Sequence, residues 1–273
     1  PRPAGGGAPL LEARDLTRTY VASSGFFRAP RRVEALKGVS FTLDRGSTLG
    51  IVGESGSGKS TLGRCVVGLE APDGGSLTFD GSELSRLRSV GARHGGRIQM
   101  IFQDPFSSLN PKMSIGQSIA IGPMTQGTPR AVAWRRACEL LELVGIKPEA
   151  ATRYPHEFSG GQRQRVGIAR ALAMDPSLIV ADEPVSALDV SVQAQVLDLF
   201  EQLQKQLDFA MLFITHDLRV AARMCDRIAV MQHGEIVETG SGADVLSNPQ
   251  HAYTRQLLAA IPALFNEAST EMS

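Results

Sequence analysis

The chain has 273 residues, of which 42% are hydrophobic and 21% charged, a composition that suits a folded protein with a substantial core. Its 28 Lys and Arg residues balance 28 Asp and Glu residues, so net charge gives no indication of nucleic-acid binding. Cys65, Cys138 and Cys225 form no C-x-x-C pair, which argues against a disulfide framework or a metal cluster. Apolar runs such as Ala210–Ile214 have the length of strands, and residues 1–20 lack the apolar centre of a signal peptide. We therefore expect a soluble cytosolic protein.

Strand patterns dominate the first hundred residues. Residues 23–32 are expected to form a loop, whose Arg28, Arg31 and Arg32 we interpret as solvated surface. An Asp-Gly pair after the alternating run at 76–80 predicts an antiparallel turn. The predicted strands are residues 10–20, two strands within 33–43 separated by a turn at Lys37-Gly38, and residues 49–52, 76–80 and 98–102, the last of them buried.

A glycine-rich stretch follows the strand at 49–52. Gly53–Ser60 has the form G-x-x-x-x-G-K-S, and Leu62, Val66 and Leu69 continue it with helical spacing. Strand, glycine-rich turn and helix are the context of a phosphate-binding loop, in which successive N–H groups and the helix N-terminus face one anion. Lys59 is then expected to reach the terminal phosphates, and the Ser60 hydroxyl to bind Mg2+.

The rest of the chain alternates between helices and strands. Residues 104–174 show only helical patterns, which predicts a helical subdomain inserted into one domain that spans 1–273. Beyond it, buried strands alternate with helices, which indicates an α/β fold with a mostly parallel sheet. The predicted elements are strands 177–181 and 210–215, helices 190–207 and 218–224, a hairpin of 227–232 with 235–239, and a C-terminal helical extension over 241–273 with helices at 241–246 and 252–260.

Polar side chains follow three of the predicted strands. Asp182 and Glu183 come after one strand, His216 after the next, and Gln103 after the strand at 98–102. If these strands are neighbours, their carboxyl ends meet at one edge of the sheet together with the phosphate-binding loop. Asp182 can then hold Mg2+, and Glu183 can act as general base towards water. The alternatives are surface carboxylates, a structural histidine and an ordinary glutamine.

A second glycine-containing motif opens a helix at residues 159–162. Ser159 can cap this helix, and Gly160 and Gly161 expose backbone N–H groups beside Gln162. Because the phosphate-binding loop already provides one anion site, the second suggests a site that another subunit completes. The alternative is an ordinary helix start that contains glycine.

Together these residues resemble the ATPase subunits of ABC transporters, from about Leu10 to Ala263. The resemblance implies an α/β fold with a RecA-like P-loop NTPase core, an N-terminal antiparallel β subdomain and an inserted α-helical subdomain. The motifs occur in the order of the family: Walker A at Gly53–Ser60, the Q-loop at Gln103, the signature at Phe158–Gln162 with Phe where Leu is commoner, Walker B at Leu178–Glu183, the D-loop at Ser186–Asp189 and the H-loop at His216.

The same resemblance implies ATP and Mg2+ as ligands. Glu183, His216 and Gln103 would be catalytic, while Ser60, Gln103 and Asp182 would hold the metal. Tyr20 falls where the family stacks an aromatic ring on adenine. The nucleotide-binding residues that it implies are Tyr20, Gly53, Glu54, Ser55, Gly56, Ser57, Gly58, Lys59, Ser60, Thr61, Ser159, Gly160, Gly161, Gln162 and Asp189.

Finer features are similar to the peptide-importer branch of the family. They are the Q-loop continuation Gln103–Pro111, Tyr154–Glu157 before the signature, and His251–Arg255 near the C-terminus. Some relatives continue into a tail whose cysteines hold an iron–sulfur cluster. Here no cysteine follows Cys225 and the sequence stops at Ser273, so we expect no iron–sulfur cluster.

The resemblance also implies partners. We expect a head-to-tail ATP sandwich with a sister ATPase subunit, a heterodimer rather than a homodimer, on two membrane permeases at the cytoplasmic face of the cell membrane. An extracytoplasmic peptide-binding protein would deliver di- or oligopeptides, although nickel or another small solute stays open as the substrate.

Other classes of P-loop protein fit less well. A GTPase or nucleotide kinase has no use for Ser159–Gln162, and the guanine-reading Asn-Lys-x-Asp motif is absent. A DNA-repair or translation ATPase of the same superfamily usually carries a long coiled-coil insertion or a second cassette. An exporter is disfavoured by the segment 103–110, and we expect no nucleic-acid partner.

Overall fold

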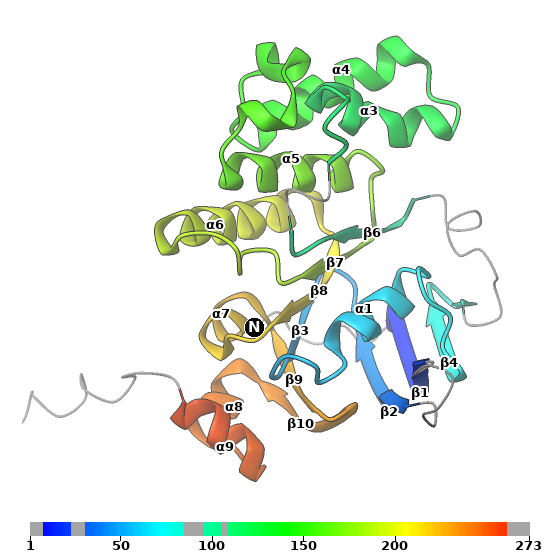
Figure 1. Ribbon diagram of the computed structural model, residues 1–273, viewed down its shortest axis with the longest axis vertical. Helices are drawn as coiled ribbons and strands as arrows, with labels where there is room; N and C mark the ends of the chain where they lie inside the picture. The colour runs from blue at the N-terminus through cyan, green and yellow to red at the C-terminus, as the bar shows by residue number, and fades with distance from the viewer. Residues whose placement is uncertain (1–7, 23–30, 85–95, 105–108, 261–273) are drawn as a thin grey trace, which may run out of the picture.

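The structure of the protein is a computed structural model, which describes residues 8–22, 31–84, 96–104 and 109–260 (Figure 1). The strands in these ranges form two sheets. The larger has the strand order β10-β9-β3-β8-β7-β6, and the smaller has the order β2-β1-β4-β5. The strands of the larger sheet are β3 (Thr48–Val52), β6 (Ile98–Ile101), β7 (Leu178–Asp182), β8 (Ala210–Thr215), β9 (Arg227–Gln232) and β10 (Glu235–Ser241).

All pairs in the larger sheet are parallel except the hairpin of β9 with β10. The smaller sheet is antiparallel and contains β1 (Leu11–Ala22), β2 (Arg31–Leu43), β4 (Gly74–Phe79) and β5 (Ser82–Glu83). The prediction of an α/β fold with a mostly parallel sheet and an N-terminal antiparallel sheet is therefore confirmed.

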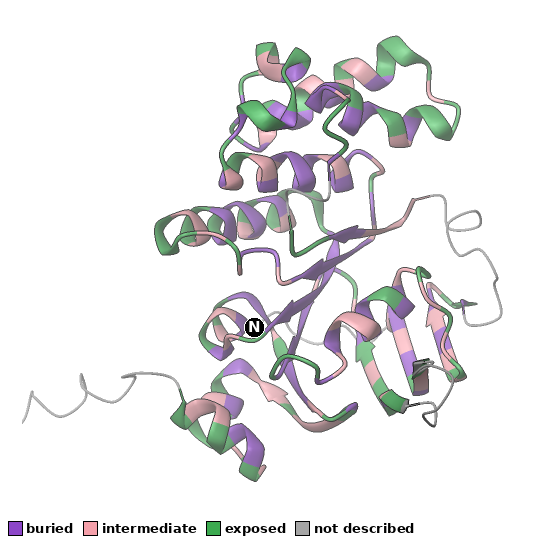
Figure 2. Cartoon of the chain, viewed as in Figure 1, coloured by how far each residue is buried: buried purple, intermediate pink, exposed green. Residues whose placement is uncertain are grey.

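Helix α1 (Lys59–Val66) packs between the two sheets. Its buried residues Leu62 and Val66 share a core with Leu49 and Ile51 of β3 and with residues of β1. The opposite face of the larger sheet packs on α6 (Val190–Leu207) and α7 (Leu218–Met224). Burial follows from this layering, and β3, β7 and β8 are buried along their whole length (Figure 2).

Between β6 and β7 the described chain is helical. Figure 1 shows these helices stacked beyond α6, away from the antiparallel sheet. They are α3 (Ile115–Thr125), α4 (Arg130–Leu143), the short 3-10 helices η1 (Pro148–Thr152) and η2 (Pro155–Glu157), and α5 (Gly160–Leu172). Two further helices, α8 (Gly242–Ser247) and α9 (Ala252–Ala259), follow β10.

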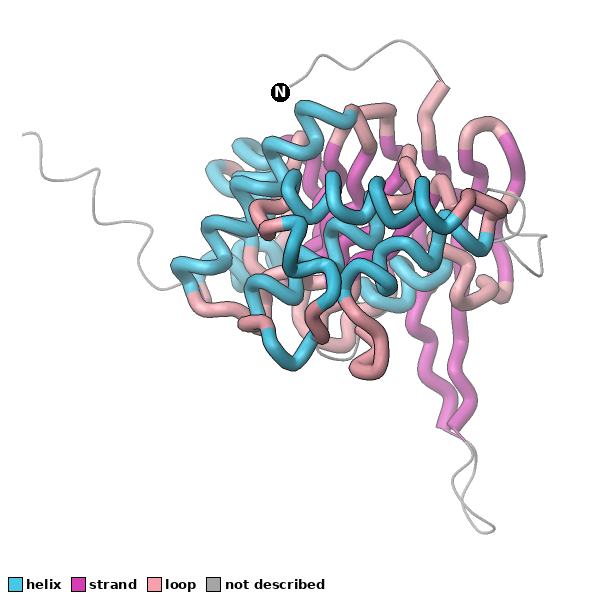
Figure 3. Tube along the Cα trace, turned by 90° about the horizontal axis from the view of Figure 1, so that it is seen from above, coloured by secondary structure: helices cyan, strands magenta, loops and turns pink. Residues whose placement is uncertain are grey.

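The prediction of two strands within residues 33–43 is wrong. Residues 31–43 form one strand, β2, which pairs with β1 from Leu11↔Leu43 to Ala22↔Arg31. Gly38 has φ +84°, but register shifts between β1 and β2 absorb it as an irregularity, so the chain does not reverse. Figure 3 shows the paired ends of β1 and β2 projecting away from the rest of the molecule. Arg31 and Arg32 therefore belong to a strand, whereas Arg28 lies outside the described residues.

The prediction of a buried strand at residues 98–102 is only partly correct. β6 ends at Ile101, and it is the edge strand of the sheet beside β7. Met100 and Ile101 are buried, but Phe102 is 38% exposed. An apolar run looks the same in an edge strand and in a central one, which explains the error.

We expect Phe200→Ala to destabilise the fold by about 3–5 kcal/mol, because Phe200 of α6 is fully buried and meets the ring of Phe213 in β8 edge-on at 6.4 Å. Urea unfolding measures the change. Val190→Ala, on the same helix at an 82% exposed position, is the matched control and should change stability by less than about 0.5 kcal/mol. Equal effects of the two substitutions would contradict the packing of α6 on the sheet.

Candidate nucleotide site

The glycine-rich loop between β3 and α1 lies directly against neighbouring backbone. A Cβ atom at Gly53 would collide with the carbonyl oxygen of Met231, and one at Gly58 with the carbonyl oxygen of Ala35. Gly58 also has φ +106° and precedes the first residue of α1. Nothing lies within 4 Å of a Cβ at Gly56. The loop is therefore packed on one side and open on the other, as a phosphate-binding loop requires.

Lys59 extends along the inside of this loop. Its Nζ donates to the carbonyl oxygens of Gly53 at 2.8 Å and Glu54 at 2.7 Å, and the side chain is buried. Burial lowers the pKa of Lys59, although the negative charges of Glu183, Asp182 and Glu54 act in the opposite direction. The ammonium group is thus held within the curl of the loop.

Asp182 stands at the end of β7 and faces the start of α1. Ser60 Oγ donates to Asp182 Oδ1 at 3.0 Å, and Asp182 is only 5% exposed. Burial raises the pKa of Asp182, and the hydrogen bond from Ser60 counteracts part of that effect. A hydroxyl and a buried carboxylate this close are hard oxygen ligands, the donor set that Mg2+ prefers.

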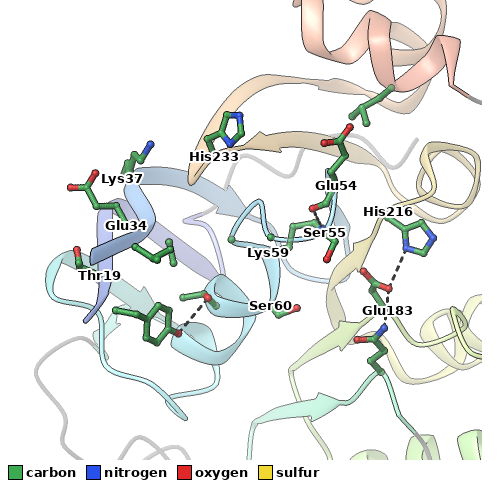
Figure 4. A pocket seen from close by; sticks show the side chains of 18 of the residues that line it. Thr19, Glu34, Lys37, Glu54, Ser55, Lys59, Ser60, Glu183, His216 and His233 are labelled. Carbon is green, nitrogen blue, oxygen red and sulfur yellow. Dashed lines mark hydrogen bonds and ion pairs between the residues drawn. The ribbon is translucent and has the colours of Figure 1, made fainter. Parts of the chain in front are cut away.

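The Glu183 carboxylate contacts both Gln103 and His216, and Figure 4 shows the side chains of Glu183 and His216 pointing toward one another. Its Oε2 accepts a hydrogen bond from Gln103 Nε2 at 3.3 Å and lies 3.2 Å from His216 Nδ1. Glu183 has φ +46°, and its N–H donates to the carbonyl oxygen of Ile214 in β8. A non-glycine residue in the left-handed region is strained, and such strain concentrates at functional sites.

These side chains meet because their strands are neighbours. β6 pairs with β7, and β7 with β8, so the three parallel strands end at the same edge. The sequence-based expectation that Gln103, Glu183 and His216 come together is confirmed as geometry; their catalytic roles stay predictions.

An open cavity of about 1350 Å³ lies over the loop. Most of the residues expected to bind nucleotide line it. They are Tyr20, Glu54, Ser55, Gly56, Gly58, Lys59, Ser60 and Thr61. The three residues expected to be catalytic, Gln103, Glu183 and His216, line the cavity as well.

Tyr20 forms part of the cavity wall. Its hydroxyl donates to the Glu70 carboxylate, and the guanidinium of Arg18 lies 5.1 Å from the centre of its ring. These contacts hold the ring at the wall, where an aromatic side chain can stack on a base.

The sequence analysis did not predict the remaining residues of the cavity wall. They come from β1 and β2, from the β9–β10 turn, and from the regions around α7 and α9: Thr19, Arg32, Val33, Glu34, Ala35, Lys37, Asp217, Arg219, His233, Leu257 and Ala260. Arg32, which we interpreted as solvated surface, is among them. The fold brings these residues to the loop, and no local motif marks them.

Ser159–Gln162 and Asp189 do not line this cavity. Ser159 caps α5 in a capping box: its Oγ accepts from Gln162 N at 3.3 Å, and its own N–H donates to Gln162 Oε1 at 3.0 Å. The predicted helix start is therefore confirmed. Ser159, Gln162 and Asp189 are exposed, whereas Gly160 is half-buried and Gly161 is buried.

Within the described ranges, no helix combines the length and apolar character needed to cross a membrane. The expectation that the protein carries no iron–sulfur cluster stays a prediction.

We expect Asp182→Asn to stabilise the nucleotide-free protein at neutral pH. The pKa of Asp182 is raised in the folded protein, so above that pKa the buried charge lowers the free energy of unfolding. Asparagine carries no charge, and its amide oxygen can still accept the hydrogen bond from Ser60. The gain should shrink as pH falls towards about 4, the ordinary carboxyl pKa, where the unfolded chain also becomes protonated. Urea unfolding at several pH values measures this dependence. Glu142→Gln, at an exposed position on α4, is the control and should show no gain; a destabilised Asp182→Asn would contradict the assignment.

Comparison with known proteins agrees with this geometry. The family model described as ABC transporter matches residues 36–186. The chain is 49% identical over 96% of its length to a putative peptide import ATP-binding protein of Brucella ovis, of which it covers 82%. It is 48% identical over 93% of its length to the oligopeptide transport ATP-binding protein OppF of Lactococcus lactis, of which it covers 81%.

A solved structure is similar as well. The ATP-binding cassette MJ0796, a dimer in a post-hydrolysis state bound to ADP and Pi, matches 85% of this chain and 98% of its own with a TM-score of 0.74 and 28% identity. The chain described here therefore belongs to the ABC transporter family, as one of its ATPase cassettes.

Proposed function

We propose that this ATPase powers the import of di- or oligopeptides through partner membrane permeases at the cytoplasmic face of the cell membrane. The main support for ATP hydrolysis is that the phosphate-binding loop, Asp182, Glu183 and His216 lie together at one edge of the sheet. The names of the relatives from Brucella ovis and Lactococcus lactis support peptides as the substrate class.

The loop supplies the contacts for the ATP phosphates. Backbone N–H groups of the loop and of the α1 start would bind the phosphates, apart from those of Glu54 and Ser57, which already donate within the protein. Lys59 adds the positive charge for the terminal phosphates. Tyr20, which also lines the cavity, would stack on the adenine.

Ser60 and Asp182 fit a Mg2+ ion, because they bring a hydroxyl and a buried carboxylate together, and Gln103 would add an amide oxygen. The bound ion would neutralise charge on the phosphates.

Glu183 is suited to take a proton from the attacking water. Its carboxylate is held from two sides by Gln103 and His216, so one oxygen is fixed while the side chain keeps access to the cavity. A base held in place just after β7, beside the cavity, supports general base catalysis by Glu183.

The α5 start is proposed to act on a nucleotide held by a second ATPase subunit. Ser159, Gly160, Gly161, Gln162 and Asp189 lie outside the cavity of their own chain, and a head-to-tail pair would place them over the partner's phosphates. A sister subunit is favoured over a second copy of this chain.

The helical region 104–174 is the proposed contact with the permeases. Apolar side chains are exposed on α3 and α4, with Ile121 at 46%, Met124 at 40% and Val132 at 48%. We propose that these exposed apolar side chains take part in the contact with the permeases. An extracytoplasmic peptide-binding protein would complete the importer.

We expect Glu183→Gln to lower the rate of ATP hydrolysis by about 10²–10⁴-fold, the usual effect of losing a general base, without loss of ATP binding. Phosphate release and nucleotide binding are measured on the same preparation. Lys59→Ala is the contrasting variant, since it should weaken nucleotide binding itself. Hydrolysis at the unmodified rate in Glu183→Gln would remove Glu183 from the role of base.

The transport function is tested by a mild-detergent pull-down from native membranes with MgATP, using Glu183→Gln to prolong the ATP-bound state. We expect to recover two permeases, a sister ATPase and a peptide-binding protein. Recovery of only soluble or nucleic-acid partners would contradict peptide import and leave the ATPase activity intact.

A further inference from the structure

The C-terminal helix α9 reaches the phosphate-binding loop. Tyr253 is in the first turn of α9, is 5% exposed, and belongs to the main hydrophobic core. Its hydroxyl oxygen accepts a hydrogen bond from the backbone N–H of Glu54 at 3.0 Å. Leu257 of the same helix and the adjoining Ala260 line the cavity above the loop. The helix is thus part of the wall of the nucleotide site.

The Glu54 residue is bonded at both of its backbone polar groups. Its N–H donates to Tyr253, and its carbonyl oxygen accepts from Lys59 Nζ at 2.7 Å and from the N–H of Ser57 at 3.2 Å. The bonds to Lys59 and Ser57 are internal to the loop. Tyr253 therefore supplies an anchor to this residue from outside the loop.

The anchor is itself held independently of the loop. Both carboxylate oxygens of Glu238 in β10 accept backbone hydrogen bonds at the α9 N-terminus, from Gln250 at 2.8 Å and His251 at 3.0 Å. The side chain of His251 in turn accepts from the N–H of Tyr253 at 3.2 Å. β10 thereby fixes the first turn of α9, and the tyrosine hydroxyl has a defined place before any nucleotide arrives.

We propose that Tyr253 is a positioning residue for the phosphate-binding loop, through which the docking of α9 sets the affinity of the site for ATP. The proposal rests on the ATPase function proposed above. Without the hydroxyl, the segment at Glu54 also samples conformations that do not bind phosphate. The apparent affinity for ATP is then the intrinsic affinity multiplied by the fraction of time spent in the binding conformation. Glu183 follows β7, whereas the Tyr253 contact is at Glu54 after β3, so we expect the chemistry at Glu183 to be unaffected once ATP is bound.

Tyr253→Phe tests this, because it removes the hydroxyl and keeps the buried ring. We expect the KM and the Kd for ATP to rise about five-fold, the effect of one net hydrogen bond of ordinary strength, with kcat within about two-fold of the unmodified protein. Tyr154→Phe is the matched control: it removes a hydroxyl from a tyrosine that is 44% exposed and absent from the cavity, and it should leave KM and Kd unchanged.

Hydrogen exchange at the Glu54 amide in the nucleotide-free protein gives a readout that needs no ATP. We expect faster exchange in Tyr253→Phe and no change in Tyr154→Phe. Unchanged exchange together with unchanged KM would overturn the proposal. Faster exchange in a protein that hydrolyses no ATP would instead support the contact and contradict the proposed function.

A second variant tests whether Tyr253 positions the loop through the docking of α9. Glu238→Ala removes the acceptor that fixes the start of α9, so it should also raise the KM for ATP, and combining it with Tyr253→Phe should add little, because both act through the same contact. Fully additive effects of the two substitutions would show separate roles and count against positioning by α9.

Discussion

The phosphate-binding loop keeps its shape because glycine lets its backbone lie directly on other backbone. Gly53 and Gly58 contact the carbonyl oxygens of Met231 and Ala35, which belong to β9 in one sheet and β2 in the other. Two further hydrogen bonds complete the contact, from Gly234 N to the Ser57 carbonyl and from Lys37 N to the Gly234 carbonyl. The antiparallel sheet, the β9–β10 turn and the loop therefore fix one another, and all three contribute to the cavity wall.

Around this loop the chain carries charges that burial disfavours. Burial lowers the pKa of Lys59 and raises that of Asp182, so each ion is less stable here than in water, and each is partly compensated by the other. The left-handed backbone of Glu183 adds local strain. Such costs are accepted where ligand binding requires them, and the fully buried strands β3, β7 and β8 provide the stability that offsets them.

Features that depend on local sequence pattern could be predicted, whereas features that depend on tertiary packing could not. Helix 190–207 and strand 210–215 were predicted with the bounds that the structure has, because their apolar periodicity and length are unambiguous. The meeting of Gln103, Glu183 and His216 followed from the rule that parallel strands end at a common edge. The cavity wall from β2 and α9 could not be predicted, since it depends on how an irregular strand and a terminal helix pack in three dimensions. The same limitation made Gly38 look like a turn, although pairing with β1 carries the strand straight through it.

A short, densely bonded turn connects Glu183 with the α5 start on the other surface. The Glu183 carbonyl accepts from both the N–H and the hydroxyl of Ser186, and Gln193 of α6 donates to the carbonyls of Val185 and Leu188 within the same turn. Helix α6 then meets α5 at Gly161, where a Cβ atom would come within 2.4 Å of the Val192 side chain and force it to move. Displacement of α5 by a partner must therefore either break this close contact or move α6 and, with it, the turn that holds the carboxylate. The two surfaces expected to bind nucleotide are thus joined through the hydrogen-bonded turn after β7 and the contact of α6 with α5 at Gly161.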